Sequence, residues 1–131
     1  MREPIRTRLL GHHRPLFEDA LACADAVTAG WDGASTTDRS MVVEPYRTTL
    51  ERAGLFEPLI HALSDAVRAA GGTLVARPVP DIPYLAITGE GIVLRGPIES
   101  GRVVITLSAF EVDPYRRGPP LPDALTVEVR R

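Results

Sequence analysis

The hydrophobic pattern of this 131-residue chain changes its period at Gly71-Gly72, and this change constrains the fold more than any other feature. Before the two glycines, apolar residues recur at the spacing of amphipathic helices. After them, apolar and polar residues alternate, which is typical of strands. We therefore expect an α+β protein, with two or three N-terminal helices packed on one face of a four- or five-stranded antiparallel sheet.

The length predicts one domain over residues 1–131, with a helical half at 1–71 and a strand half at 73–131. Apolar residues make up 44% of the chain, and a chain of this size can bury a core without a disulfide or a metal. The net charge of -2 excludes a strongly basic nucleic-acid coat and a strongly acidic tail.

Prolines and glycines divide the helical half. A helix is expected to start at Glu3-Pro4, because proline is tolerated in a first turn. Gly11 and Pro15 either kink this helix or separate it from a second one that ends at Gly30. Further helices are expected from Glu44-Pro45 to Gly54 and from Glu57-Pro58 to Gly71.

Expected strands of the second half lie at 73–77, 84–88, 92–95, 102–112 and 124–130. The segment 102–112 has apolar residues on both faces, with Val104, Phe110 and Val112 on one of them. Such a strand is usually central or covered. The segment 113–123 contains four prolines and is expected to be irregular and exposed.

Missing residue types exclude several kinds of chemistry. The chain has no Lys, Asn or Gln, which rules out a lysine Schiff base and a phosphate-binding loop built on lysine. Cys23 is the only cysteine, so no intrachain disulfide can form and a cytoplasmic location is expected. No apolar run is long enough to cross a bilayer, so we expect no membrane partner.

No catalytic residue, metal site or cofactor is predicted. His12 and His13 are adjacent, and neighbours on a helix point in different directions, so they are poorly placed to share one metal ion. The chain has no zinc-binding spacing of His or Cys, no serine nucleophile elbow and no glycine-rich phosphate motif. Cys23 lies between alanines on a helix and is expected in the core.

The distribution of arginine is the one anomaly. Residues 1–14 hold four arginines and one glutamate, whereas residues 15–38 hold five acidic residues and no arginine. Positive charge at a helix N-terminus opposes the helix dipole, so helix stability does not explain it. The plainer interpretation, which we prefer, is that arginine fills every basic position. The candidate anion- or partner-binding residues are Arg2, Arg6, Arg8, Arg14, Tyr115, Arg116 and Arg117.

Three segments resemble small uncharacterised proteins of halophilic archaea: Val42-Val43-Glu44-Pro45-Tyr46-Arg47, Gly71-Gly72-Thr73-Leu74 and the paired strands from Tyr84 to Arg95. The resemblance implies a fold and a source, and it implies no activity. Exclusive use of arginine fits GC-rich coding. A net charge of -2 is far less acidic than usual for halophilic cytosolic proteins, so another GC-rich source, such as an actinobacterium, stays open.

Our leading functional hypothesis is a non-enzymatic cytoplasmic interaction module that forms a homo-oligomer or binds another protein. It rests on the absence of chemical motifs and on a sheet with two apolar faces. A second hypothesis is nucleic-acid binding through the N-terminal arginines and the Tyr115–Arg117 loop. A third is a small-ligand or enzyme pocket between helices and sheet, with Trp31, His61 and Tyr84 as candidate lining residues.

Overall fold

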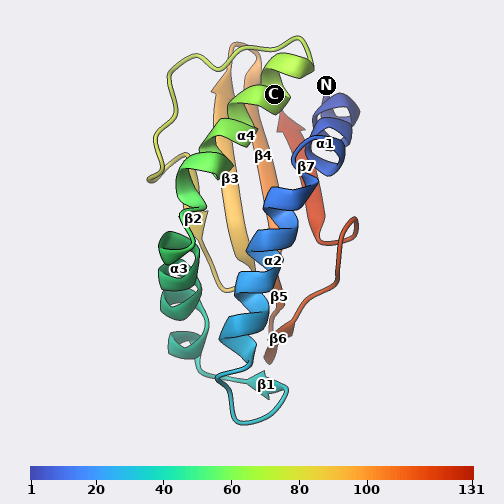
Figure 1. Ribbon diagram of the computed structural model, residues 1–131. Coiled ribbons are helices and arrows are strands. Elements are labelled where there is room, and N and C mark those ends of the chain that lie inside the picture. Colours follow the sequence, from blue (N-terminus) through green and yellow to red (C-terminus); the bar gives the residue numbers. More distant parts are fainter.

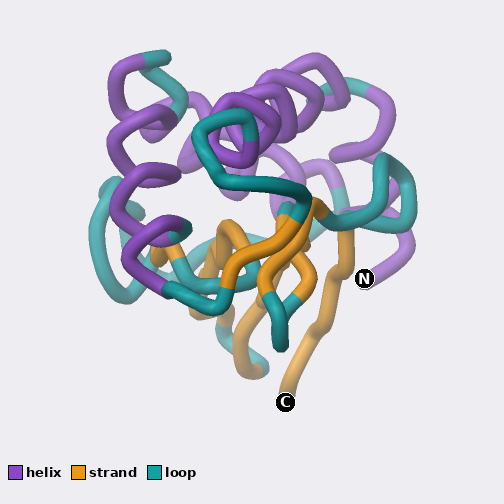
Figure 2. The backbone as a smooth tube through the Cα atoms, turned by 90° about the horizontal axis from the view of Figure 1, so that it is seen from below, coloured by secondary structure: helices purple, strands orange, loops and turns teal.

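The computed structural model describes all residues from Met1 to Arg131 and confirms the α+β expectation (Figure 1). Helices form one layer and strands form the other, as the view along the sheet shows (Figure 2). Four α-helices are present, more than the two or three expected, and a short 3-10 turn, η1, precedes the third. Their bounds are α1 Arg2–Gly11, α2 Arg14–Thr28, η1 Arg39–Met41, α3 Val43–Arg52 and α4 Phe56–Ala69.

Helices α1 and α2 are two separate helices and not one long, kinked helix. His12 and His13 form the turn between them, and Pro15 lies in the first turn of α2, where its missing N–H costs nothing. Helix α4 ends at the predicted stop, because Gly71 takes a φ of +84°, which favours glycine. None of the helices combines the length and the apolarity that crossing a membrane requires.

The main sheet has four antiparallel strands in the order β2-β3-β4-β7. Their bounds are β2 Leu85–Ile87, β3 Gly91–Ile98, β4 Gly101–Ser108 and β7 Leu125–Arg130. Leu94 pairs with Ile105, which pairs with Val127 on its other side. All three side chains are buried and face the helical layer, where α4 packs on β3 and α1 packs on β7.

A second, three-stranded sheet corrects two expectations. Its order is β1-β6-β5, with β1 at Ser35–Thr36, β6 at Tyr115–Arg117 and β5 at Phe110–Glu111. The segment 113–123 is therefore not wholly irregular. The segment 102–112 is not one strand either, because the ladder breaks at Ala109 and the chain continues in the other sheet.

This break changes where Phe110 points. Its ring is 1% exposed and lies edge-to-face against Tyr46, with ring centroids 5.1 Å apart. Val112, expected on the same face, is 47% exposed. Burial of a large aromatic ring outweighs continuation of the strand ladder, which explains why simple alternation failed here.

The sheet face away from the helices is less apolar than expected. Val93 and Val104 lie on that face, since each is next in sequence to a side chain that faces the helices, yet both are buried. The expected strand at 73–77 is also absent. Only Leu74 forms an isolated bridge with Ile98, and the Val75 amide donates to the Pro97 carbonyl.

Candidate functional site

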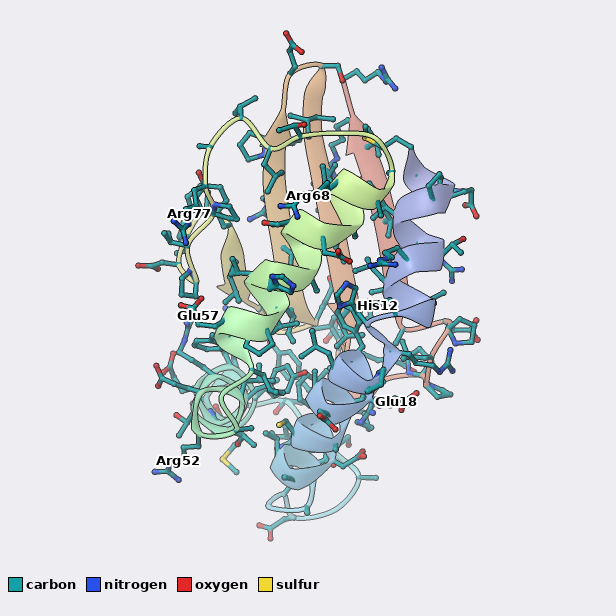
Figure 3. The ribbon with its side chains drawn as sticks, turned by 45° about the horizontal axis from the view of Figure 1, so that its top comes forward. His12, Glu18, Arg52, Glu57, Arg68 and Arg77 are labelled. Atoms are coloured by element: carbon teal, nitrogen blue, oxygen red, sulfur yellow. The ribbon has the colours of Figure 1, made fainter.

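Helix α4 presents four polar side chains on the face opposite the core. Ser64 and Asp65 lie three and four residues after His61, and Arg68 lies three residues after Asp65 and four after Ser64, which places all four on one side of the helix. The other side buries six apolar side chains, so the orientation of α4 is fixed. Figure 3 shows Arg68 on α4, with Arg77 on the segment that returns alongside it. The buried side chains are Leu59, Ile60, Ala62, Leu63, Ala66 and Val67.

A cavity of about 580 Å³ lies between α4 and residues 72–78, and we call it the α4 pocket. Its polar side chains are His61, Ser64, Arg68, Thr73 and Arg77, and the rest of its lining comes from Gly72, Leu74, Val75, Ala76 and Pro78. No carboxylate lines it. Two guanidinium groups, an imidazole and two hydroxyls thus surround one hollow.

The two arginines of the α4 pocket are free to bind a ligand. Arg68 and Arg77 are exposed, and neither has a carboxylate within 4.0 Å or a side-chain hydrogen bond to the protein. A smaller cavity of about 170 Å³ adjoins the pocket and brings in Glu57 beside His61. Arg68 lies in the last turn of α4, where a cation also interacts favourably with the helix dipole. Arg77 has no such structural role.

Beside the pocket, Asp65 is held by two partners from the N-terminal helices. Arg8 donates from Nε to Oδ2 over 2.8 Å and from Nη2 to Oδ1 over 3.3 Å. His13 Nε2 lies 2.6 Å from Oδ2. The hydrogen bonds from Arg8 and then His13 hold the pKa of Asp65 well below its usual range. Because an ionised carboxylate only accepts, Nε2 of His13 is the donor.

All three histidines of the chain come together near Asp65. The rings of His12 and His13 are 4.8 Å apart, and those of His13 and His61 are 6.5 Å apart. Donor atoms of His12, His13 and Asp65 all lie within 4.8 Å of one another. His12 and His13 were expected on a helix, whereas they lie in a turn, and Asp65, 52 residues from His13, was not expected beside them.

The four N-terminal candidate arginines have acceptors within the chain. Beyond the bond from Arg8 to Asp65, Arg2 pairs with Glu3 at 3.0 Å, and Arg14 lies 3.6 Å from Glu18. Arg6 donates to the carbonyl of Pro122 over 3.2 Å. These residues belong to α1 and the start of α2 and do not form a free arm.

The candidates on β6 lie elsewhere. Figure 1 shows β6 near the end of the molecule opposite α1. Arg117 pairs with Asp25 at 2.8 Å and also donates to the carbonyls of Ala109, Gly118 and Leu21, so it ties β6 to α2. Tyr115 is half-buried, and only Arg116 points fully to solvent. The seven arginine and tyrosine candidates are therefore not one surface.

Of the three pocket candidates, only His61 lines the α4 pocket or its neighbouring cavity. Trp31 is buried, donates from Nε1 to the Met41 carbonyl over 2.8 Å and packs near Phe110. Tyr84 is partly buried and directly precedes β2. Cys23 is buried as expected, and burial followed by the charge of Asp19 raises the pKa of its thiol.

Comparison with known proteins gives a family and no activity. No curated protein matches the chain, and no solved structure matches it. The family described as "Domain of unknown function (DUF7988)" matches residues 3–130, which is nearly the whole length. The chain therefore belongs to the DUF7988 family.

Proposed function

We propose that this protein binds a small anionic molecule, carrying a phosphate or carboxylate group, in the α4 pocket. The observation that carries the proposal is that a hollow of about 580 Å³ contains Arg68 and Arg77 and no carboxylate. Uncompensated positive charge inside a concavity concentrates anions more than the same charge on a convex surface. This is the third of the sequence-based hypotheses, with a different set of residues around His61.

The residue types suit such a ligand. Arginine matches planar and tetrahedral oxyanions through paired N–H donors, and serine and threonine hydroxyls complete the shell. A volume of about 580 Å³ fits the usual range of small-molecule sites. Glu57, in the adjoining cavity, would accept a hydrogen bond from a ligand hydroxyl or amine. A small metabolite with one anionic end and one donor end therefore fits best.

An unpaired arginine alone would not support this proposal. Arg52 is also exposed, lies in the last turn of α3 and has no carboxylate partner, yet it lines neither the α4 pocket nor the cavity beside it. Figure 3 shows Arg52 well away from Arg68 and Arg77. What distinguishes Arg68 and Arg77 is that they share one cavity. Arg52 thus provides a matched control of the same charge and helix position as Arg68.

The test is isothermal titration calorimetry with inorganic pyrophosphate and, separately, citrate. Comparing the two shows whether phosphate or carboxylate is preferred. We expect saturable binding of one anion per chain that weakens as salt is added. R68A and R77A should each weaken it about tenfold, as expected for loss of a partly exposed charge-assisted contact. R52A should change the affinity less than twofold.

Equal weakening by R52A and R77A would show general charge attraction and contradict the proposal. Absence of saturable binding by either anion at low salt would contradict it as well. Circular dichroism checks that each variant stays folded, which is expected because the three side chains are exposed.

The other hypotheses stay predictions. Self-association rested on a second apolar sheet face, and that face has fewer exposed apolar side chains than the pattern suggested. Nucleic-acid binding rested on six arginines, and all of them except Arg116 have an acceptor within the chain. We place the proposed ligand binding in the cytoplasm, on the single cysteine, and in a halophilic archaeal or other GC-rich host, on the resemblance of the three segments and the exclusive use of arginine.

A further inference from the structure

A second chemical feature of the molecule lies at the turn between α1 and α2, opposite α4. His12 and His13 occupy the turn, and Asp65 faces them from α4. Two imidazoles and one carboxylate are within 4.8 Å of one another, measured between possible ligand atoms. This set is independent of the α4 pocket, because neither His12, His13 nor Asp65 lines that cavity.

The spacing is close to what a metal ion requires. Zinc binds imidazole nitrogen and carboxylate oxygen at about 2.0–2.2 Å, so two such ligands at a tetrahedral angle are about 3.3 Å apart. The His13–Asp65 distance of 2.6 Å is that of a hydrogen bond and must open slightly. His12 is exposed and makes no side-chain hydrogen bond within the chain, so its ring can turn inward at little cost.

The surroundings restrict which ion would bind. Two of three donors are imidazoles, which favours Zn²⁺, Ni²⁺ or Cu²⁺ over the oxygen-seeking Mg²⁺ and Ca²⁺. Arg8 donates to both oxygens of Asp65, over 2.8 Å to Oδ2 and over 3.3 Å to Oδ1, and would orient the carboxylate as an outer partner. The positive charge of Arg8 also repels a metal cation bound at Asp65, so the affinity for the metal ion should be moderate.

We propose that His12, His13 and Asp65 form a binding site for a divalent transition-metal ion of the zinc type. The site has three protein ligands, and a fourth position is then left for water or another small ligand. The group of possible ligand atoms within 4.8 Å of one another comprises His12, His13 and Asp65, so His61 is not part of the proposed site. Metal binding displaces the hydrogen-bonded proton between His13 and Asp65.

The test is calorimetric titration of the metal-free full chain with ZnCl₂, with Co²⁺ absorption spectra as a report on coordination. We expect one Zn²⁺ per chain, and no binding of Mg²⁺ at the same concentration. H12A should weaken Zn²⁺ binding at least tenfold. H61A, which removes a neighbouring histidine of similar exposure, should leave it within twofold.

H12A removes an exposed side chain without a hydrogen bond, so its melting temperature without metal should equal that of the unaltered chain. D65N is a second variant and should also weaken Zn²⁺ binding at least tenfold, with its fold checked by circular dichroism. Equal losses in H12A and H61A would indicate unspecific binding to surface histidines and overturn the proposal. Absence of saturable Zn²⁺ binding to the unaltered chain would overturn it too.

Discussion

Replacement of Phe110 by alanine tests the most informative difference between the sequence pattern and the structure. Phe110 is 1% exposed and contacts two aromatic rings, those of Tyr46 at 5.1 Å and Trp31 at 6.1 Å between centroids. An aromatic side chain of this kind buries roughly 150–250 Å², worth about 4–6 kcal/mol at 25 cal/mol per Å². Measured truncations of buried Phe cost about 3–5 kcal/mol, and we expect F110A to fall in that range.

Val112 is the matched control. If residues 102–112 were one strand, Phe110 and Val112 would share a face and respond alike. In the structure Val112 is 47% exposed, so V112A should change the free energy of unfolding by less than about 0.5 kcal/mol. Urea unfolding followed by circular dichroism measures both changes, and F110A should also melt about 10–20 °C lower.

Equal effects of F110A and V112A, or a loss below about 1 kcal/mol in F110A, would refute the placement of Phe110 in the core. If F110A does not fold, F110L keeps an apolar side chain at the position. It should still unfold more easily than V112A, because the aromatic contacts are lost.

Three further predictions concern stability and reactivity. Deletion of the chain after Pro122 removes β7, including two fully buried side chains, and should leave the protein insoluble or unfolded; an unchanged melting temperature would contradict this. Cys23 should react with a thiol reagent at pH 8 much more slowly in the native than in the urea-unfolded protein, because burial raises the pKa of its thiol. The hydrogen bonds from Arg8 lower the pKa of Asp65, so the ion pair stabilises the folded protein while Asp65 is ionised. Without metal, the free energy of unfolding of the unaltered chain should exceed that of D65N by a constant amount above about pH 4, and this difference should decline at lower pH. A difference that grew in acid would contradict the ion pair.

The regular parts of the fold could be predicted because their signals are local. Gly71 ends α4 as expected, and the hairpin from β2 to β3 lies where the glycines around Glu90 indicated. The alternation in β7 also holds, with Leu125 and Val127 buried and Thr126 exposed. In each case neighbouring residues carry the information, and tertiary packing agrees with it.

The failures come from contacts across long sequence distances. Phe110 leaves the strand pattern because Tyr46 and Trp31 offer it a buried site, and neither residue is near it in sequence. Asp65 was not among the candidate residues, because its partners Arg8 and His13 lie far from it in sequence, on α1 and at the start of α2. His61 was singled out for a pocket, but Arg68 and Arg77 were not, since nothing in the sequence indicates that residues 72–78 fold back along α4.

Binding of a small anion in the α4 pocket is most directly tested by amide chemical shifts. A ¹⁵N-labelled sample is titrated with the better-binding anion, pyrophosphate or citrate, and the amide resonances are followed. We expect saturable shifts that are largest at Ser64, Arg68 and residues 73–77, because these residues line the pocket. Largest shifts on α1 or β6, or the absence of saturable shifts anywhere, would contradict it.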